Sequence, residues 1–318
     1  MASETQTSPT LSPATAFGLL MILALSWGVA WPVNKAILSY MSPLWSVAAR
    51  LALGAIVVGL VSVLSGKLRL PPRQDIPVVL SLALLHMSAF GMLCALGLMY
   101  VSAGRTVLLA YTTPLWVFPF AWLFAGEMMT AQRLLAIASG ILGLLLLVNP
   151  LAIQWQDSGV LTGHALILLA AIIWAASIVF TRMHRWASSA FDLLFWQLLL
   201  AAATCTTAAL IFEGWPSIDA TPHFYALLLY GGTISSSLAY WAQSTINRSL
   251  PATSTALGLL AVPVFGVVSS MITLGEPFDA FTIAALLLIV GGIAVGILPS
   301  RKIRSEAVAP SRGGPKAP

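Results

Sequence analysis

Apolar residues run through the chain in segments of about 20, separated by short polar or charged breaks. A helix needs roughly 20 residues to cross the ~30 Å hydrocarbon core of a bilayer, so each segment is long enough to span a membrane. We therefore expect an all-α integral membrane protein embedded in a lipid bilayer. The pattern predicts ten transmembrane helices, at residues 16–36, 43–64, 76–98, 104–125, 131–149, 161–181, 190–212, 222–245, 252–274 and 280–298.

The second half of the chain repeats the first. Residues 103–150 match residues 252–299 at a fixed offset of 149, without a gap. The identical pairs are Ala103/Ala252, Thr106/Thr255, Leu108/Leu257, Pro114/Pro263, Gly126/Gly275, Glu127/Glu276, Ala131/Ala280, Ala136/Ala285, Gly143/Gly292 and Pro150/Pro299.

Five predicted helices fall in each half, at residues 16–150 and 151–299. A unit with an odd number of crossings enters and leaves on opposite faces, so its copy must be inserted upside down. We therefore expect two inverted five-helix repeats. This arrangement is typical of secondary transporters, whose site lies near the midplane and opens alternately to each side.

The basic residues predict the orientation, because short cytoplasmic loops collect Lys and Arg. With the N-terminus inside, twelve of the fifteen basic residues fall on the cytoplasmic side, Lys35 and Arg105 fall on the other, and Arg50 lies within a helix. Both tails, a disordered one at 1–15 and a basic one at 300–318, are then cytoplasmic. We expect a multi-pass protein of the inner (plasma) membrane. The net charge of +5 follows from this topology and does not indicate a nucleic-acid partner.

The composition limits the cargo. Hydrophobic residues make up 59% of the chain, charged residues only 8%, and the mean hydropathy is +0.94, which excludes an ordinary soluble domain. All carboxylates fall at predicted helix ends, in loops or in tails, so none is available at mid-membrane to exchange a proton for a cation. A carrier of phosphorylated anions would need several embedded cations, and only Arg50 qualifies. The expected cargo is neutral overall or zwitterionic.

Catalysis is not expected. An intramembrane enzyme would need metal ligands, a Ser/His/Asp group or paired carboxylates at membrane depth, whereas His86 stands at mid-membrane without a partner acid. Cys94 and Cys205 both fall inside predicted helices and are interpreted as apolar packing residues. The sequence therefore predicts no catalytic residues, no metal and no cofactor.

Polar residues inside the helix at 222–245 share one face. Gly232, Ser236, Tyr240 and Gln243 follow i, i+4, i+8, i+11 spacing. That face is not expected to meet lipid. Two interpretations stay open at this point: the wall of a cavity, or a seam of hydrogen bonds between helices.

Aromatic side chains at membrane depth provide the other candidates. Trp27 lies too deep for an interfacial aromatic belt, and His86 is followed one turn later by Phe90. Each offers a ring face for stacking, and most offer one polar group for orientation. His86 is interpreted as a substrate contact or a proton carrier, with a neutral histidine bonded to a neighbouring helix as the alternative. The aromatic candidates are Trp27, His86, Phe90, Tyr111, Trp174 and, as a weaker choice over Gln197, Trp196.

Matched prolines predict hinges. Pro114 and Pro263 lie about ten residues into their helices, where each removes a backbone hydrogen bond near the midplane. The freed carbonyls are tolerated only against protein or a watery cavity, which places both helices around a central path. Gly232 is a further candidate bending point. A static kink that improves packing is the alternative.

The segment from Tyr100 to Val148 resembles the EamA-type pattern of the drug/metabolite transporter superfamily. The resemblance covers nearly the whole chain. It is carried by Ser102-Ala103-Gly104-Arg105, Thr113-Pro114-Leu115, Gly126-Glu127, Gly275-Glu276 and Ser26-Trp27-Gly28. It implies ten helices in two inverted repeats, and the general similarity is greatest to bacterial YddG-type exporters of aromatic and other amino acids.

The two repeats differ where a site is expected, since Arg105 is matched by Ser254 and Tyr111 by Leu260. Such asymmetry suits a substrate with one aromatic side and one polar end. We expect an exporter of neutral, bulky amino acids that works by alternating access and facilitated diffusion. The alternatives are a multidrug exporter of amphipathic cations and a proton-coupled metabolite exporter. The oligomeric state stays open, and a monomer is compatible with the sequence.

Overall fold

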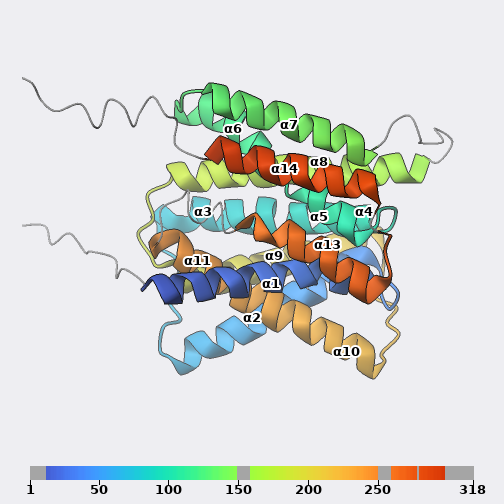
Figure 1. Cartoon of the computed structure of the whole chain (residues 1–318). Coiled ribbons are helices and arrows are strands. Elements are labelled where there is room, and N and C mark those ends of the chain that lie inside the picture. The colour runs from blue at the N-terminus through green and yellow to red at the C-terminus, as the bar shows by residue number, and fades with distance from the viewer. Residues whose placement is uncertain (1–11, 149–157, 250–258, 278, 298–318) are drawn as a thin grey trace, which may run out of the picture.

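The computed structural model describes residues 12–148, 158–249, 259–277 and 279–297, and within these ranges the chain is helical and contains no strand. The helices run along one common direction (Figure 1). Six of them are long and apolar enough to cross a membrane: 14–37, 43–64, 73–98, 103–125, 159–183 and 190–212. The expectation of an all-helical, multi-pass membrane protein is thereby confirmed, while the count of ten helices stays a prediction.

The described residues form α-helices, one 3-10 turn (η1) and two π-helical segments (η2 and η3). The elements in chain order are α1 (Pro13–Ile37), α2 (Pro43–Leu64), η1 (Arg73–Asp75), α3 (Ile76–Leu80), η2 (Ser81–Ala89), α4 (Phe90–Leu98), α5 (Ala103–Ala110), α6 (Thr113–Ala125), α7 (Ala131–Val148), α8 (Ser158–Met183), α9 (Ala190–Phe212), α10 (Pro222–Leu229), η3 (Tyr230–Leu238), α11 (Ala239–Ser249), α13 (Ala261–Leu274) and α14 (Ala280–Ile297).

Several predicted helices are made of more than one element. The helix expected at 76–98 is continuous from α3 through η2 to α4, and the one expected at 222–245 runs from α10 through η3 to α11. Residues 252–258, the start of the helix expected at 252–274, lie outside the described residues, as do residues 1–11 and 298–318 of the two tails. Three shorter apolar helices, at 131–146, 261–274 and 280–296, account for further predicted spans.

The π-helical segments η2 and η3 occupy positions that differ by the same offset of 149 residues. In η2 the Ser88 hydroxyl donates to the Ala83 carbonyl at 2.7 Å, and in η3 the Ser237 hydroxyl donates to the Gly232 carbonyl at 2.9 Å. Both bonds reach back five residues. Only one residue, the serine, is identical between the two segments, so the structural repeat continues where the sequence repeat is no longer visible.

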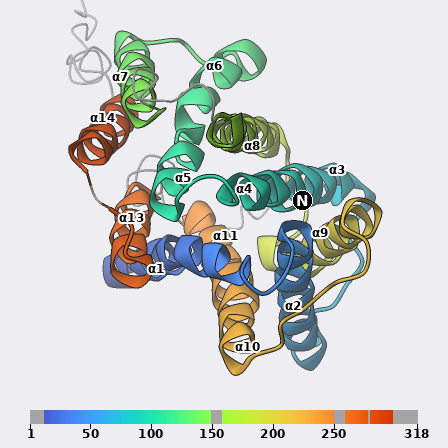
Figure 2. The ribbon, with the colours of Figure 1, turned by 90° about the vertical axis from the view of Figure 1, so that its right-hand side faces the viewer.

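Helices α7 and α14 pack side by side at one edge of the bundle (Figure 2). A Cβ atom on Gly143 would lie 2.8 Å from Ile289, and one on Gly292 would lie 2.8 Å from Ser139, so both glycines permit close contact. The Ser139 hydroxyl donates to the Leu288 carbonyl at 2.9 Å. These two residues are 149 apart, so matched positions of the two halves meet each other here.

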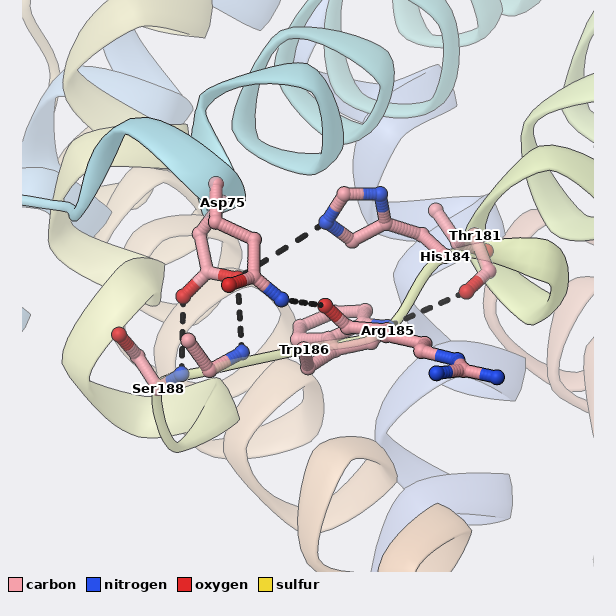
Figure 3. A network of polar contacts seen from close by, with 8 residues as sticks. Asp75, Thr181, His184, Arg185, Trp186 and Ser188 are labelled. Atoms are coloured by element: carbon pink, nitrogen blue, oxygen red, sulfur yellow. Dashed lines mark hydrogen bonds and ion pairs between the residues drawn. The ribbon is translucent and has the colours of Figure 1, made fainter.

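Carboxylates join the two halves at the ends of the bundle. Glu213, just after α9, accepts hydrogen bonds from the Ser42 hydroxyl at 2.6 Å and from the Leu44 amide at 2.9 Å, at the start of α2. Asp75 accepts the amides of Ala187 at 2.9 Å and Ser188 at 2.8 Å, before α9 (Figure 3). Glu213 satisfies amide groups that the start of α2 leaves without partners, and Asp75 holds the segment that leads into α9. These two carboxylates are thus used in contacts between the halves at the bundle ends.

Candidate functional site

A cavity lies among the helices near the middle of the bundle. About 730 Å³ is free of protein atoms when open solvent is included, and the centres of water-sized molecules have about 80 Å³ available. The second value describes the room inside, since the first includes solvent. A cavity needs about 10–15 Å³ on that measure to hold one water, so this space is several times what a single water requires.

The cavity is lined by residues from both halves of the chain, and no Asp or Glu is among those that the structure describes. They are Trp27, Ala30, Trp31, Asn34, Ser46, Val47, Arg50, His86, Met87, Phe90, Gly91, Cys94, Ala95, Leu98, Tyr111, Trp174, Ser235 and Tyr240.

Trp174 of α8 is the centre of an aromatic cluster. The His86 ring stacks on it with centroids 4.9 Å apart and planes 12° apart. Phe90 lies 4.9 Å away, Tyr111 5.8 Å and Trp27 6.4 Å. Offset and edge-to-face ring contacts of this kind hold aromatic side chains in defined orientations. The cluster therefore gives the cavity a largely aromatic lining.

Tyr240 of α11 extends the cluster from the second half of the chain. Its ring centroid lies 5.6 Å from Trp27 and 5.5 Å from His86, both edge to face. Trp27 is also tied to η3, because its indole N–H donates to the Ser235 carbonyl at 3.2 Å. Six of the residues proposed from the sequence thus lie together around one cavity: Trp27, His86, Phe90, Tyr111, Trp174 and Tyr240.

Three members of this cluster carry polar groups. These groups are the ring nitrogens of His86 and the hydroxyls of Tyr111 and Tyr240, all on residues that line the cavity. A mostly apolar cavity with a few convergent polar groups is the usual form of a small-molecule site. Across the described ranges, no three His, Cys, Asp or Glu side chains are grouped so that they could hold a metal ion.

Trp196, Gln243 and Ser236 do not line the cavity. The indole N–H of Trp196 donates to the Arg69 carbonyl at 2.8 Å, and its ring contacts Phe195, so it faces the end of the bundle. Gln243 is half-buried on α11. Ser236 is fully buried directly behind the cavity wall and contacts a lining residue, as described next.

Arg50 of α2 was not proposed as a site residue from the sequence, yet it lines the cavity. Its guanidinium donates to the Ser236 hydroxyl at 3.1 Å. A Cβ atom on Gly231 would lie 3.0 Å from the Arg50 Cδ, so that glycine makes room for the side chain. The sequence alone marks Arg50 as unusual, because it is the only basic residue well inside a predicted helix.

The predicted hinge at Pro114 coincides with a break in the helix. Helix α5 ends at Ala110, Tyr111 and Thr112 form a turn, and Pro114 is the second residue of α6, where its missing N–H costs no hydrogen bond. Pro263 is likewise the third residue of α13. Gly232 packs against α2, where an added Cβ would lie 2.6 Å from the Leu53 side chain. That these points bend during function stays a prediction.

Comparison with known proteins agrees with this architecture. A family model, described as EamA-like transporter family, matches the chain twice, at residues 15–149 and 161–298. The uncharacterized transporter YvbV of Bacillus subtilis (strain 168) is 27% identical over 91% of this chain and 94% of its own length. A probable amino-acid metabolite efflux pump of Salmonella typhimurium (strain LT2) is 25% identical over 91% of this chain and 97% of its own length.

A solved crystal structure aligns with the chain at a TM-score of 0.62, with 18% identity, over 94% of this chain and 100% of that one. At this identity the likeness shows the fold alone. The family model, by contrast, matches most of the sequence and the relatives are transporters. The protein is therefore a membrane transporter rather than an enzyme, and it belongs to the EamA-like transporter family.

Proposed function

We propose that the protein exports neutral, bulky amino acids, aromatic ones foremost, across the inner membrane. The observation that carries this proposal is the cavity, which combines aromatic rings packed around Trp174 with a few polar groups on residues from both halves of the chain. Aromatic faces favour an aromatic or large apolar side chain. The similarity to the probable amino-acid metabolite efflux pump of Salmonella typhimurium supports the same class of cargo.

Transport proceeds by alternating access between two inverted five-helix repeats in a ten-helix protein with both termini in the cytoplasm. Two observations support the repeat: the family model matches the chain twice, and α7 meets α14 through residues 149 apart. Gly143 approaches Ala285 while Gly292 approaches Ala136, as expected for two helices related by a two-fold axis. An axis in the membrane plane between repeats is typical of secondary transporters.

The proposed energetics are facilitated diffusion. The described residues of the cavity lining include no carboxylate, and Asp75, Glu213 and Glu127 at the bundle ends are paired with backbone amides or an arginine. A proton-coupled exporter of cations normally needs an exchangeable carboxylate at membrane depth. His86 provides the alternative proton carrier, and an amphipathic-cation exporter is the second candidate, because aromatic faces also attract cations.

Uptake into liposomes of purified protein tests these proposals. Labelled phenylalanine, threonine, choline and a hexose phosphate are offered with and without an imposed pH gradient. We expect saturable uptake of phenylalanine that does not depend on the gradient. Uptake confined to choline would overturn the cargo, and phenylalanine uptake that requires a proton gradient would overturn the energetics.

A further inference from the structure

Arg50 places a positive charge deep in the bundle. It lies seven residues after Pro43, the first residue of α2, which is about 10 Å along the helix axis. Its side chain passes between Gly231 of η3 and Gly91 of α4, where an added Cβ would lie 3.8 Å from the Arg50 Nη2. A cation at this depth is costly unless a partner or a watery cavity receives it.

No carboxylate is paired with Arg50 in the described part of the chain. Within the described residues, its guanidinium donates to the uncharged Ser236 hydroxyl at 3.1 Å. The carboxylates of Glu213 and Glu276, for example, accept backbone amides at helix starts instead. The cavity therefore has one uncompensated positive charge.

We propose that Arg50 binds the carboxylate of the transported molecule, while the aromatic cluster receives its apolar part. This inference rests on the proposed function and gives it a charge requirement. One guanidinium matches the single charge and planar shape of one carboxylate. A phosphate ester carries about two charges and would call for further cations, which the lining does not contain.

The same charge selects against cations. An amphipathic amine without an acid group would bring a second positive charge into the cavity beside Arg50, and like charges brought together disfavour binding. The cavity is thereby directed toward zwitterionic amino acids and simple carboxylic acids. Gly231 acts as a positioning residue, because a methyl group there would press on the aliphatic part of Arg50, 3.0–3.2 Å away.

Competition against labelled phenylalanine uptake tests the charge requirement. The competitors are phenylalanine, phenylalanine amide, phenethylamine and 3-phenylpropionate, which keep or lose the acid and the amine separately. For the wild-type protein we expect the two carboxylates to compete about tenfold or more better than the amide and the amine, as for loss of a charged hydrogen bond.

Variants of Arg50 test whether this residue causes the preference for carboxylates. Arg50→Gln is expected to abolish the preference for carboxylates and to raise the KM for phenylalanine about tenfold or more. Arg50→Lys keeps the charge and is expected to keep the preference. Arg73→Gln serves as a matched control, because Arg73 is exposed at the end of the bundle. Gly231→Ala is expected to weaken phenylalanine binding without changing any charge.

The melting temperature of the purified protein, measured with and without 3-phenylpropionate or phenethylamine, shows independently of transport whether the protein is folded and binds each compound. Phenylalanine transport that ignores the acid group, or an Arg50→Gln protein that is folded and keeps the preference, would overturn the role of Arg50 and leave the proposed function standing. If phenylalanine is not transported but 3-phenylpropionate stabilises the wild-type protein and not Arg50→Gln, the amino acid cargo fails and the carboxylate site stands. If none of the four compounds binds, both fail.

Discussion

The segments η2 and η3 share one backbone and differ in their side chains. Both are π-helical, both lie at matched positions 149 residues apart, and both use a serine to bond back five residues. Toward the cavity, however, η2 and the following residue present His86 and Phe90, whereas η3 and its following residue carry Ser235 and Ala239 at the matched positions.

The features that η2 and η3 share belong to the backbone framework, and the side chains that differ belong to the candidate site. The π-helical turn and its serine bond recur in both halves, so they belong to the shared scaffold; π-helical turns occur often beside functional sites. His86 of η2 and the following Phe90 place rings against Trp174, and η3 places the Ser236 hydroxyl beside Arg50. A cavity built this way has one apolar side and one polar side although its scaffold is nearly symmetric.

The largest effect is expected when the first segment is given the side chains of the second. The double variant His86→Ser/Phe90→Ala removes two rings that contact Trp174 and is expected to lower kcat/KM for phenylalanine about tenfold or more. Phe212→Ala, on a side chain 78% exposed at the end of α9, is the control and should transport normally. A folded double variant with normal transport would remove the cavity from the transport path.

Glu276 and Glu127 are a matched pair with unequal surroundings. Glu276 accepts the Ala103 amide at 2.6 Å and the Gly104 amide at 2.8 Å, whereas Glu127 pairs with Arg133 at 2.7 Å near the surface. Glu276→Gln is expected to lower the free energy of unfolding by about 1–3 kcal/mol and Glu127→Gln by about 0–1 kcal/mol. Denaturation in detergent measures both, and equal losses would contradict the difference in their roles.

The matched serines should behave alike if the π-helical scaffold is truly common to the halves. Ser88→Ala and Ser237→Ala each remove one buried bond to a carbonyl five residues back. Each is expected to lower the free energy of unfolding by about 0.5–1.5 kcal/mol. A loss at only one of the two sites, measured in the same detergent, would show that the shared geometry is held by different contacts.

The smallest effect concerns the helix starts before α7 and α14. Thr130 accepts the Arg133 amide at 3.3 Å, and its counterpart Asp279 accepts the Thr282 amide at 2.7 Å. The hydrogen bonds from Thr282, with a contribution from Arg105, lower the pKa of Asp279 below its usual 3.8. Its stabilising contribution is therefore present above pH ~3.8 and is lost as the pH falls toward the lowered pKa.

Asp279→Thr gives the second half the residue found at the matched position of the first, Thr130. This variant should no longer lose that part of its stability as the pH falls. The effect is a few tenths of a kcal/mol at most, because the Asp279 side chain is 42% exposed and solvent screens its charge. Melting temperatures between pH 3 and pH 6 compare the variant with the wild type. An identical acid dependence in both proteins would mean that other groups cause it.

Much of the fold follows from local features of the sequence. Apolar length predicted the spanning helices, and the prolines at 114 and 263 marked helix interruptions, since a residue without an N–H disturbs a helix whatever surrounds it. Depth along a helix was enough to select Trp27, His86 and Trp174. Depth along a helix does not determine which way a side chain points. Trp196 lies on α9, but its indole N–H donates to the Arg69 carbonyl at the end of the bundle.

The sequence by itself determined that this chain is helical, lies in a membrane and contains a duplicated segment, because hydropathy and residue identity are properties of the chain alone. Only the tertiary structure decided that Arg50 meets Ser236, that the π-helical turns match, and that rings from α1, η2, α4, α8 and α11 meet around one cavity. Those outcomes depend on which helix faces pack together. Packing is a relation between segments distant in sequence, so no local pattern contains it.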